Sequence, residues 1–97
     1  MITLAVKYQC NPGKSDEVIA ALRRMSALVK QHEPGCHAYQ ISRSNDDPDA
    51  LLLYELYIDQ AALDFHAQTD YFKEIVQGEA IPLLASRERA FYTLEIE

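Results

Sequence analysis

Tryptophan is absent from the 97-residue chain, and cysteine and glycine are scarce, with two and three residues. The two cysteines, Cys10 and Cys36, allow at most one disulfide bond. The first residues lack the basic start and long apolar stretch of a secretory signal, so we expect a reducing, cytoplasmic setting with free, buried thiols. No CxxC motif or Cys/His cluster has metal-ligand spacing, so no metal site is predicted.

Positive charge is also scarce: the chain has 9 Lys and Arg against 15 Asp and Glu, and its net charge is −6. Nucleic-acid binding depends on clustered basic residues and is therefore not expected. The pair Arg23-Arg24 fits the solvated face of a helix, while Arg87 and Arg89 are interleaved with Glu88. No apolar run approaches the roughly 20 residues that a membrane helix needs. We predict neither a nucleic-acid nor a membrane partner.

Motifs that hold cofactors or activated nucleophiles are missing as well. The chain contains no Gly-rich phosphate loop, no GxGxxG and no nucleophile elbow. We therefore predict no cofactor, and any oxidation would have to draw its electrons from the substrate.

What the chain does have is a high apolar content of 48%, arranged with clear periodicity. Alternation of period two predicts strands, and apolar spacings of three and four predict helices. The expected strands are 2–10, 37–43, 51–58 and 87–96, with helices over 15–31, 60–68 and 70–79. Ser15 and Asp59 are the expected N-caps of the first two helices, and the turn Glu33-Pro34-Gly35 should end the first.

This order predicts a single α+β domain, 1–97, of ferredoxin-like β-α-β-β-α-β topology with one antiparallel sheet. The helices suffice to cover one face of that sheet. Strands 2–10 and 51–58 carry apolar side chains on both faces, so the second face should also be covered. No element remains to cover it, and a second copy of the chain is the simplest candidate. We therefore expect a homodimer.

Several short motifs together resemble one known family. They are Glu33-Pro34-Gly35-Cys36, then Tyr39 and Arg43, then Leu53-Tyr54-Glu55, then Asp59-Gln60-Ala61-Ala62-Leu63, His66 and Tyr71-Phe72-Lys73. At these spacings they resemble the antibiotic biosynthesis monooxygenase (ABM) domain family over nearly the whole chain. The resemblance implies a dimeric α+β barrel, with a pocket between sheet and helices in each subunit.

The family that the chain resembles is functionally mixed, so the fold alone does not settle the activity. Its members include cofactor-independent oxygenases of polycyclic phenols or quinols, haem-degrading enzymes, and an isomerase for a phosphorylated signalling molecule. The haem-degrading branch needs an Asn, a Trp and a haem-ligating His at positions that match Lys7, His66 and Val76 here. The resemblance therefore disfavours haem degradation.

Two residues are the candidates for catalysis. His66 lies in the short helix where the family commonly carries His, and histidine exchanges protons near neutral pH. Glu55 is the single charge in a strand that should be buried on both faces, so it needs a partner or a raised pKa. It could orient His66, act as an acid or base itself, or form a structural salt bridge. The alternative for His66 is a half-buried structural side chain bonded to Glu55 or to a backbone carbonyl.

Four further residues are candidates for lining a substrate pocket. Tyr39 and Tyr57 could share the sheet face of Glu55, and Tyr71 lies near the break between the last two helices. Such rings would hold a flat aromatic substrate, although core or dimer contacts are the commoner role of tyrosine. Arg43 could bind an anionic substrate or pair with an acid such as Glu55.

These observations lead to one functional hypothesis and two alternatives. The first is a cofactor-independent monooxygenase that deprotonates a quinol or phenolic small molecule, which then reacts directly with dioxygen. The second is an isomerase that moves protons on a small hydroxy-ketone with the same His66 and Glu55. The third is a dimer that binds a small molecule without turnover.

Overall fold

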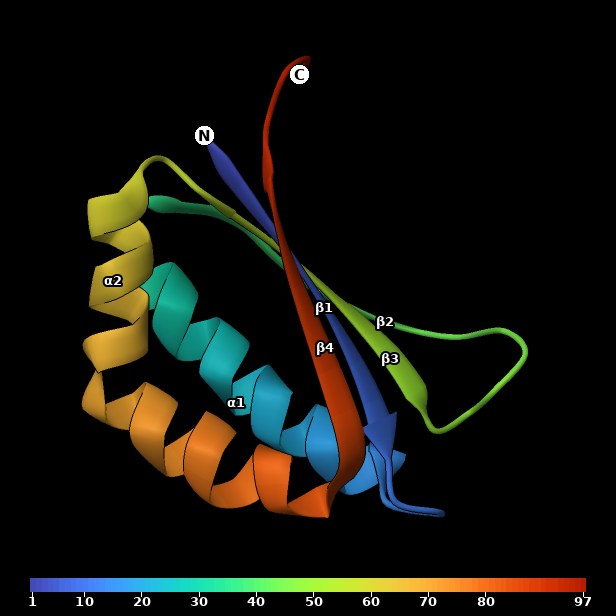
Figure 1. The fold of residues 1–97 in the computed structure, drawn as a ribbon. Coiled ribbons are helices and arrows are strands. Elements are labelled where there is room, and N and C mark those ends of the chain that lie inside the picture. Colours follow the sequence, from blue (N-terminus) through green and yellow to red (C-terminus); the bar gives the residue numbers. More distant parts are fainter.

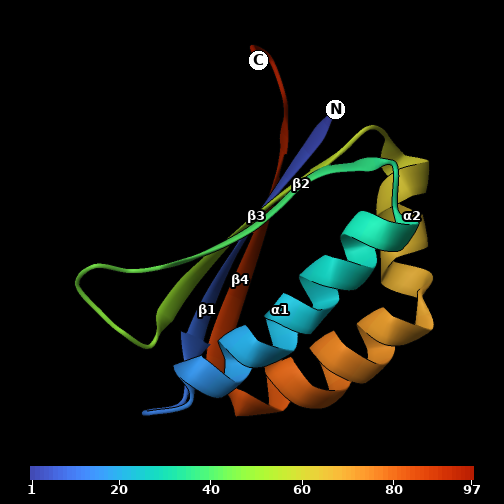
Figure 2. The same ribbon diagram turned by 180° about the vertical axis from the view of Figure 1, so that it is seen from behind.

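A computed structural model describes all residues, 1–97. The elements are β1 (Ile2–Cys10), α1 (Ser15–His32), β2 (Cys36–Arg43), β3 (Ala50–Tyr57), α2 (Gln60–Gln68), the π-helical η1 (Phe72–Ala80), the short 3₁₀ turn η2 (Ile81–Leu83) and β4 (Leu84–Thr93). The strands form one antiparallel sheet of order β2-β3-β1-β4, with β3 and β1 in the centre. The helices lie together on one face of this sheet (Figures 1 and 2). The predicted α+β ferredoxin-like fold is confirmed.

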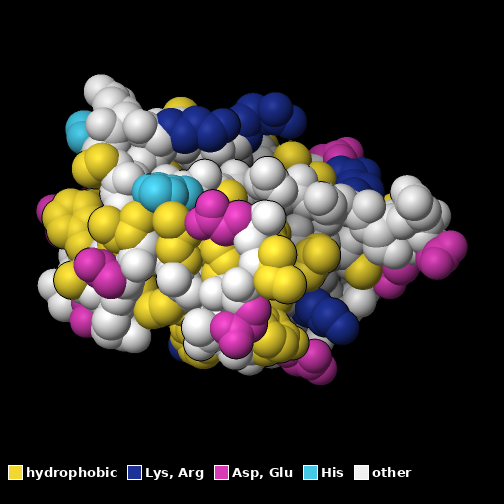
Figure 3. All heavy atoms as spheres, turned by 90° about the horizontal axis from the view of Figure 1, so that it is seen from above, with side chains coloured by type: hydrophobic (Ala, Val, Ile, Leu, Met, Phe, Trp, Pro, Cys, Tyr) yellow, Lys and Arg dark blue, Asp and Glu magenta, His cyan; other side chains and the backbone are white.

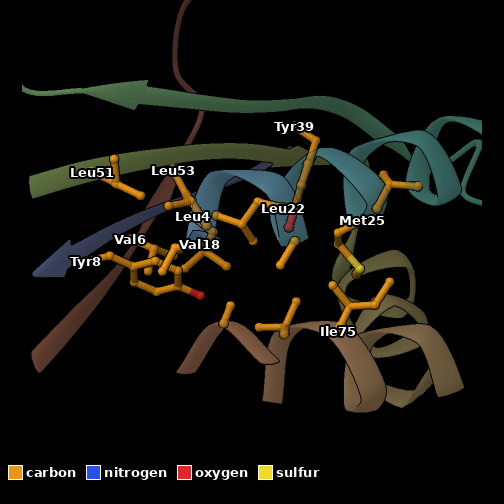
Figure 4. Packing of buried hydrophobic residues seen from close by; sticks show 14 of the residues in the cluster. Leu4, Val6, Tyr8, Val18, Leu22, Met25, Tyr39, Leu51, Leu53 and Ile75 are labelled. Carbon is orange, nitrogen blue, oxygen red and sulfur yellow. The ribbon is translucent and has the colours of Figure 1, made fainter. Parts of the chain in front are cut away.

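The core lies between the sheet and the helices, and the alternation of β1 and β3 explains it. Leu4, Val6 and Tyr8 of β1 and Leu51 and Leu53 of β3 point toward the helices, where Val18, Leu22, Met25 and Ile75 meet them (Figure 4). The α1 side chains Val18, Leu22 and Met25 are fully buried. Burial of such a side chain contributes about 1.5–3 kcal/mol, so α1 is held mainly by this stripe.

Two expectations about element ends were wrong. Lys14, not Ser15, is the N-cap residue of α1 and makes no side-chain cap; Ser15 is already helical and buried. The last strand runs over Leu84–Thr93 rather than 87–96. It starts early because η2 ends at Leu83, and it ends at Thr93 because that residue pairs with Ile2, where β1 begins. Beyond Thr93, the N–H of Leu94 still donates a 3.0 Å hydrogen bond to the Met1 carbonyl, but β1 has no further residue to pair with.

Other details of the chain agree with the sequence. Asp59 caps α2 by accepting a hydrogen bond from the backbone N–H of Ala62 at 2.9 Å. Cys10 and Cys36 are free thiols, and burial raises the pKa of the Cys36 thiol to about 11. No helix has both the length and the apolar character that a membrane crossing requires.

The edge strand β4 differs from the other three strands. Its ten residues include none that is buried, and only β1 makes extensive contacts with it. The helices thus cover β2, β3 and β1, whereas β4 is left exposed. This exposed strand becomes important for the site.

A close backbone approach at Gly35 holds the turn after α1 against α2. The carbonyl of Gly35 accepts a hydrogen bond from the N–H of Ile58 at 2.9 Å. A Cβ atom on Gly35 would lie 2.7 Å from the Cβ of Ala62, which is shorter than real contacts allow. Only glycine lets the turn and the helix meet at this distance.

We therefore predict that Gly35→Ala lowers the free energy of unfolding by about 1–3 kcal/mol, because the turn and α2 must separate. Urea unfolding measures this loss. Gly78→Ala is the matched control, since a Cβ there meets only the Lys73 carbonyl oxygen at 3.4 Å; it should cost nothing. Equal stabilities of the two variants would contradict the close approach.

Candidate active site

His66 is the one buried residue of α2, and its imidazole points into the core. Its ring lies among three aromatic rings, with centroids 5.8 Å from Tyr39, 5.4 Å from Tyr57 and 5.2 Å from Phe72. The Asp59 cap fixes where α2 starts, and the helical repeat then directs residue 66 inward. A polar ring in such surroundings needs partners for both nitrogens.

Glu33 is the partner of the Nδ1 atom of His66. Its carboxylate oxygens lie 2.9 and 3.2 Å from that nitrogen, and the hydroxyl of Tyr71 donates a 2.5 Å hydrogen bond to the same carboxylate. Because Glu33 accepts from both groups, the proton of a neutral His66 belongs on Nδ1. The Nε2 atom is then left with its lone pair.

Glu55 lies on the other side of the ring, with Oε1 3.7 Å from Nε2 of His66. The hydroxyl of Tyr57 donates a 2.5 Å hydrogen bond to that oxygen. Burial raises the pKa of Glu55, and the Tyr57 hydrogen bond and the charge of His66 oppose this rise only in part. The two carboxylates therefore differ: Glu33 receives two hydrogen bonds, whereas Glu55 receives one and is held closer to its protonated form.

A cavity of about 240 Å³ opens beside these groups, between the sheet and the helices. Tyr39, Glu55 and His66 line it, as the sequence predicted for a pocket. Its other lining residues were not singled out as pocket residues, and come from β1, β3, α2, η1 and β4: Leu4, Val6, Tyr8, Leu53, Gln60, Leu63, Asp64, Ala67, Phe72, Val76, Arg87, Arg89 and Phe91.

Three predicted pocket residues lie elsewhere. Arg43 is on the exposed end of β2, where it donates a 2.7 Å hydrogen bond to Asp16. It forms no salt bridge with Glu55 and does not line the cavity. Tyr57 and Tyr71 do not line the cavity; they donate to the two carboxylates that flank His66. Both tyrosines therefore belong to the site as hydrogen-bond donors to its carboxylates.

Glu33 is the main residue that sequence reasoning missed, because an acid before Pro-Gly has the pattern of an exposed turn. It is only 4% exposed. The signal available was its place four residues after Val29, the last member of the apolar stripe of α1, which does not reveal its partner 33 positions away. The inner side chains of β4 could not be placed either, because the expected strand, 87–96, was shifted by three residues from the strand in the structure, Leu84–Thr93.

The tyrosines that line the cavity are not suited to act as bases. Burial, and then the charge of Glu55, raises the pKa of Tyr8 to about 12 and that of Tyr39 well above its ordinary value. Their hydroxyls stay protonated at neutral pH. No group of three or more His, Cys, Asp or Glu side chains is placed to hold a metal ion. Besides these tyrosines and the two arginines, the ionisable side chains that line the cavity are His66, Glu55 and Asp64.

The profile of the antibiotic biosynthesis monooxygenase (ABM) family matches residues 1–78. The chain belongs to this family. The resemblance carried by the short motifs is thereby confirmed, and the α+β sheet-and-helix arrangement described above is that of an ABM domain.

Individual proteins are similar to this chain over most of its length. The uncharacterised protein sll1783 of Synechocystis sp. is 34% identical over 93 residues, which make up 96% of this chain and 63% of that protein. The chain therefore spans 63% of the length of this curated relative. A candidate antibiotic biosynthesis monooxygenase from Caulobacter crescentus superposes with a TM-score of 0.89 at 30% identity, covering 97% of this chain and 90% of that one. A conserved protein from Methanosarcina mazei gives 0.87 at 26%, covering 97% and 92%.

The raised pKa of Glu55 predicts a pH-dependent stability. Above the ordinary value of 4.5 the folded ABM domain still holds a proton on Glu55 that the unfolded chain has lost. The folded state then binds more protons, so this contribution to stability falls as the pH rises through the folded pKa. The advantage of the native chain over Glu55→Gln should therefore shrink from pH 4.5 toward neutrality.

Urea unfolding of both proteins over that pH range measures the change. Glu79→Gln provides a control of opposite sign, because the hydrogen bond from Arg24 lowers the pKa of Glu79. There the native advantage should be lost as the pH falls. Parallel pH profiles for the native chain and Glu55→Gln would contradict the raised pKa.

Proposed function

We propose that this ABM domain is a cofactor-independent monooxygenase of a quinol or related dihydroxy-aromatic compound. The observation that carries the proposal is the asymmetric setting of His66: Glu33 holds Nδ1 at 2.9 Å, while Nε2 faces Glu55 and the 240 Å³ cavity. A histidine held in this way is set up as a general base toward the cavity.

In this proposal a substrate ring lies among the aromatic side chains of the cavity, with a hydroxyl group directed at Nε2 of His66. Nε2 takes the hydroxyl proton, and the Glu33 carboxylate stabilises the imidazolium that forms. The hydrogen bond from Tyr71 keeps Glu33 in place. Apolar lining residues such as Phe72 and Val76 limit the water around the anion.

The electron-rich anion then reduces dioxygen. A carbon–oxygen bond forms at the ring carbon next to the ionised oxygen, and protonation gives a hydroperoxide. Loss of the hydrogen on that carbon and cleavage of the O–O bond release water and leave a carbonyl group. A hydroquinone and one dioxygen thus yield a hydroxyquinone and one water, the substrate losing the four electrons that dioxygen gains. Glu55, whose pKa is raised by burial, is the group that supplies a proton to the peroxide.

Oxygen uptake with a panel of dihydroxy-aromatic compounds tests the proposal. We expect uptake with formation of the hydroxyquinone, and a loss of about 10²-fold or more in kcat for His66→Gln, because general base catalysis contributes this much. His37→Gln, on the exposed side of β2, is the control and should retain the activity.

The remaining outcomes separate the alternatives. Conversion of a hydroxy-ketone by the same His66 without oxygen uptake would establish the isomerase instead. Binding without conversion of any compound, unchanged in His66→Gln, would establish the non-catalytic reading. Either result would overturn the monooxygenase proposal.

We further propose that the domain works as a homodimer through the outer face of the sheet. Ala5, Tyr54 and Leu56 occupy the centre of this face on neighbouring strands, and no helix covers them. Lys7 and Glu88 lie opposite each other on β1 and β4 beside this centre, so the face carries both signs of charge. In a two-fold interface the same patch of both copies meets, which allows Lys7 of one copy to face Glu88 of the other. Figure 3 shows hydrophobic side chains exposed over the surface seen from above, among acidic ones.

The dimer predicts a specific effect of a charge at the centre of the outer face. Leu56→Arg should convert the protein to a monomer, measured by light scattering after size exclusion, because the buried charge would lack a partner. Phe65→Arg is the control: Phe65 lies on α2 and is 53% exposed, away from the sheet face. A native chain that is monomeric at micromolar concentration would contradict the dimer.

A further inference from the structure

Two arginines of the edge strand, Arg87 and Arg89, line the same cavity as His66. They are two residues apart on β4, so both side chains are on the inner face, opposite Tyr8 and Val6 of β1. Their charges act on groups inside: both lower the pKa of Tyr8, and Arg89 lowers that of Glu55, against the larger effect of burial. The cavity therefore has a cationic side at β4.

Neither guanidinium has a carboxylate partner, in contrast to two other arginines of the chain. Arg24 forms hydrogen bonds to Glu79, and Arg43 forms one to Asp16. Arg87 and Arg89 form no salt bridge. Arg89 instead lies over the ring of Phe91, 5.5 Å from its centroid, which holds the cation at the cavity by a cation–π contact.

The acids that line the cavity do not neutralise this pair. Glu55 accepts a hydrogen bond from Tyr57 at the inner end and forms no salt bridge with either arginine. Asp64 is exposed on α2, where it accepts a 2.9 Å hydrogen bond from the Gln60 amide. Two cations at the open side are thus left for a ligand.

The size of the cavity limits that ligand. An apolar cavity of about 150 Å³ accommodates benzene, and this one has a volume of about 240 Å³. A single ring with two or three substituents fits inside. Because Arg87 and Arg89 line the same cavity as His66, a ring seated at His66 can present a further substituent to them.

We propose that Arg87 and Arg89 form an anion-binding subsite, so that the substrate is a single hydroxylated aromatic ring carrying an oxyanion substituent. This inference rests on the proposed function in that the hydroxyl must face His66. The planar guanidinium groups match a carboxylate or phosphate with paired hydrogen bonds. In this proposal Arg87 and Arg89, rather than Arg43, bind the anionic group of the substrate.

Binding under anaerobic conditions tests the subsite without turnover. The probes are 2,5-dihydroxybenzoate, its neutral methyl ester, and 4-hydroxyphenyl phosphate, with Kd measured by calorimetry at fixed ionic strength. The native chain should bind at least one of the anions about tenfold more tightly than the ester, since charged hydrogen bonds contribute on this scale. Whichever anion binds more tightly identifies the substituent.

The double variant Arg87→Gln/Arg89→Gln should lose this preference while its Kd for the ester stays unchanged. Arg43→Gln is the matched control, because it removes an exposed arginine outside the cavity and should keep the preference. Equal affinities for anions and ester, no binding of either anion, or an unchanged preference in the double variant would overturn the subsite. An anion preference without oxygen uptake would leave the subsite standing and overturn the monooxygenase alone.

Discussion

The hydrogen bond between His66 and Glu33 joins buried polar groups that lie 33 positions apart in the sequence. Glu33 follows α1, His66 lies in α2, and Tyr71, which donates to Glu33, lies just before η1. A buried carboxylate without donors would cost several kcal/mol, so these groups must come together when the chain folds. The Glu33 carboxylate is satisfied by His66 and Tyr71, whereas Nε2 of His66, 3.7 Å from Glu55, makes no hydrogen bond.

The same network gives the two nitrogen atoms of the imidazole unequal surroundings. Glu33 receives two hydrogen bonds and sits behind His66, while Glu55 is desolvated, receives one, and lies 3.7 Å from Nε2. Equal carboxylates on both sides would leave the ring without a preferred tautomer. The difference in donors supplies that preference and directs the lone pair toward Glu55 and the cavity. The hydrogen bonds that satisfy the buried Glu33 carboxylate thus also fix the tautomer of His66.

Much of this arrangement could be predicted from local pattern, because period-two alternation decides which strand residues share a face. Tyr39, Glu55 and Tyr57 were placed together on that basis, and they are. His66 was found through the resemblance and the helical repeat. Glu33 could not be found, since an acid beside Pro-Gly has the local pattern of an exposed turn. The inner residues of β4 required its pairing with β1, which is set by long-range contacts rather than by local pattern.

The open side of the cavity follows from the number of helices available. An 18-residue α1 with α2 and η1 covers β2, β3 and β1, and nothing is left for β4. Exposed inner positions on β4 tolerate charge at no desolvation cost, which is why arginines can occupy them. A ligand that enters there meets the cations first and the buried His66 last. The incomplete helical layer thus creates both the entrance to the site and the charge at its mouth.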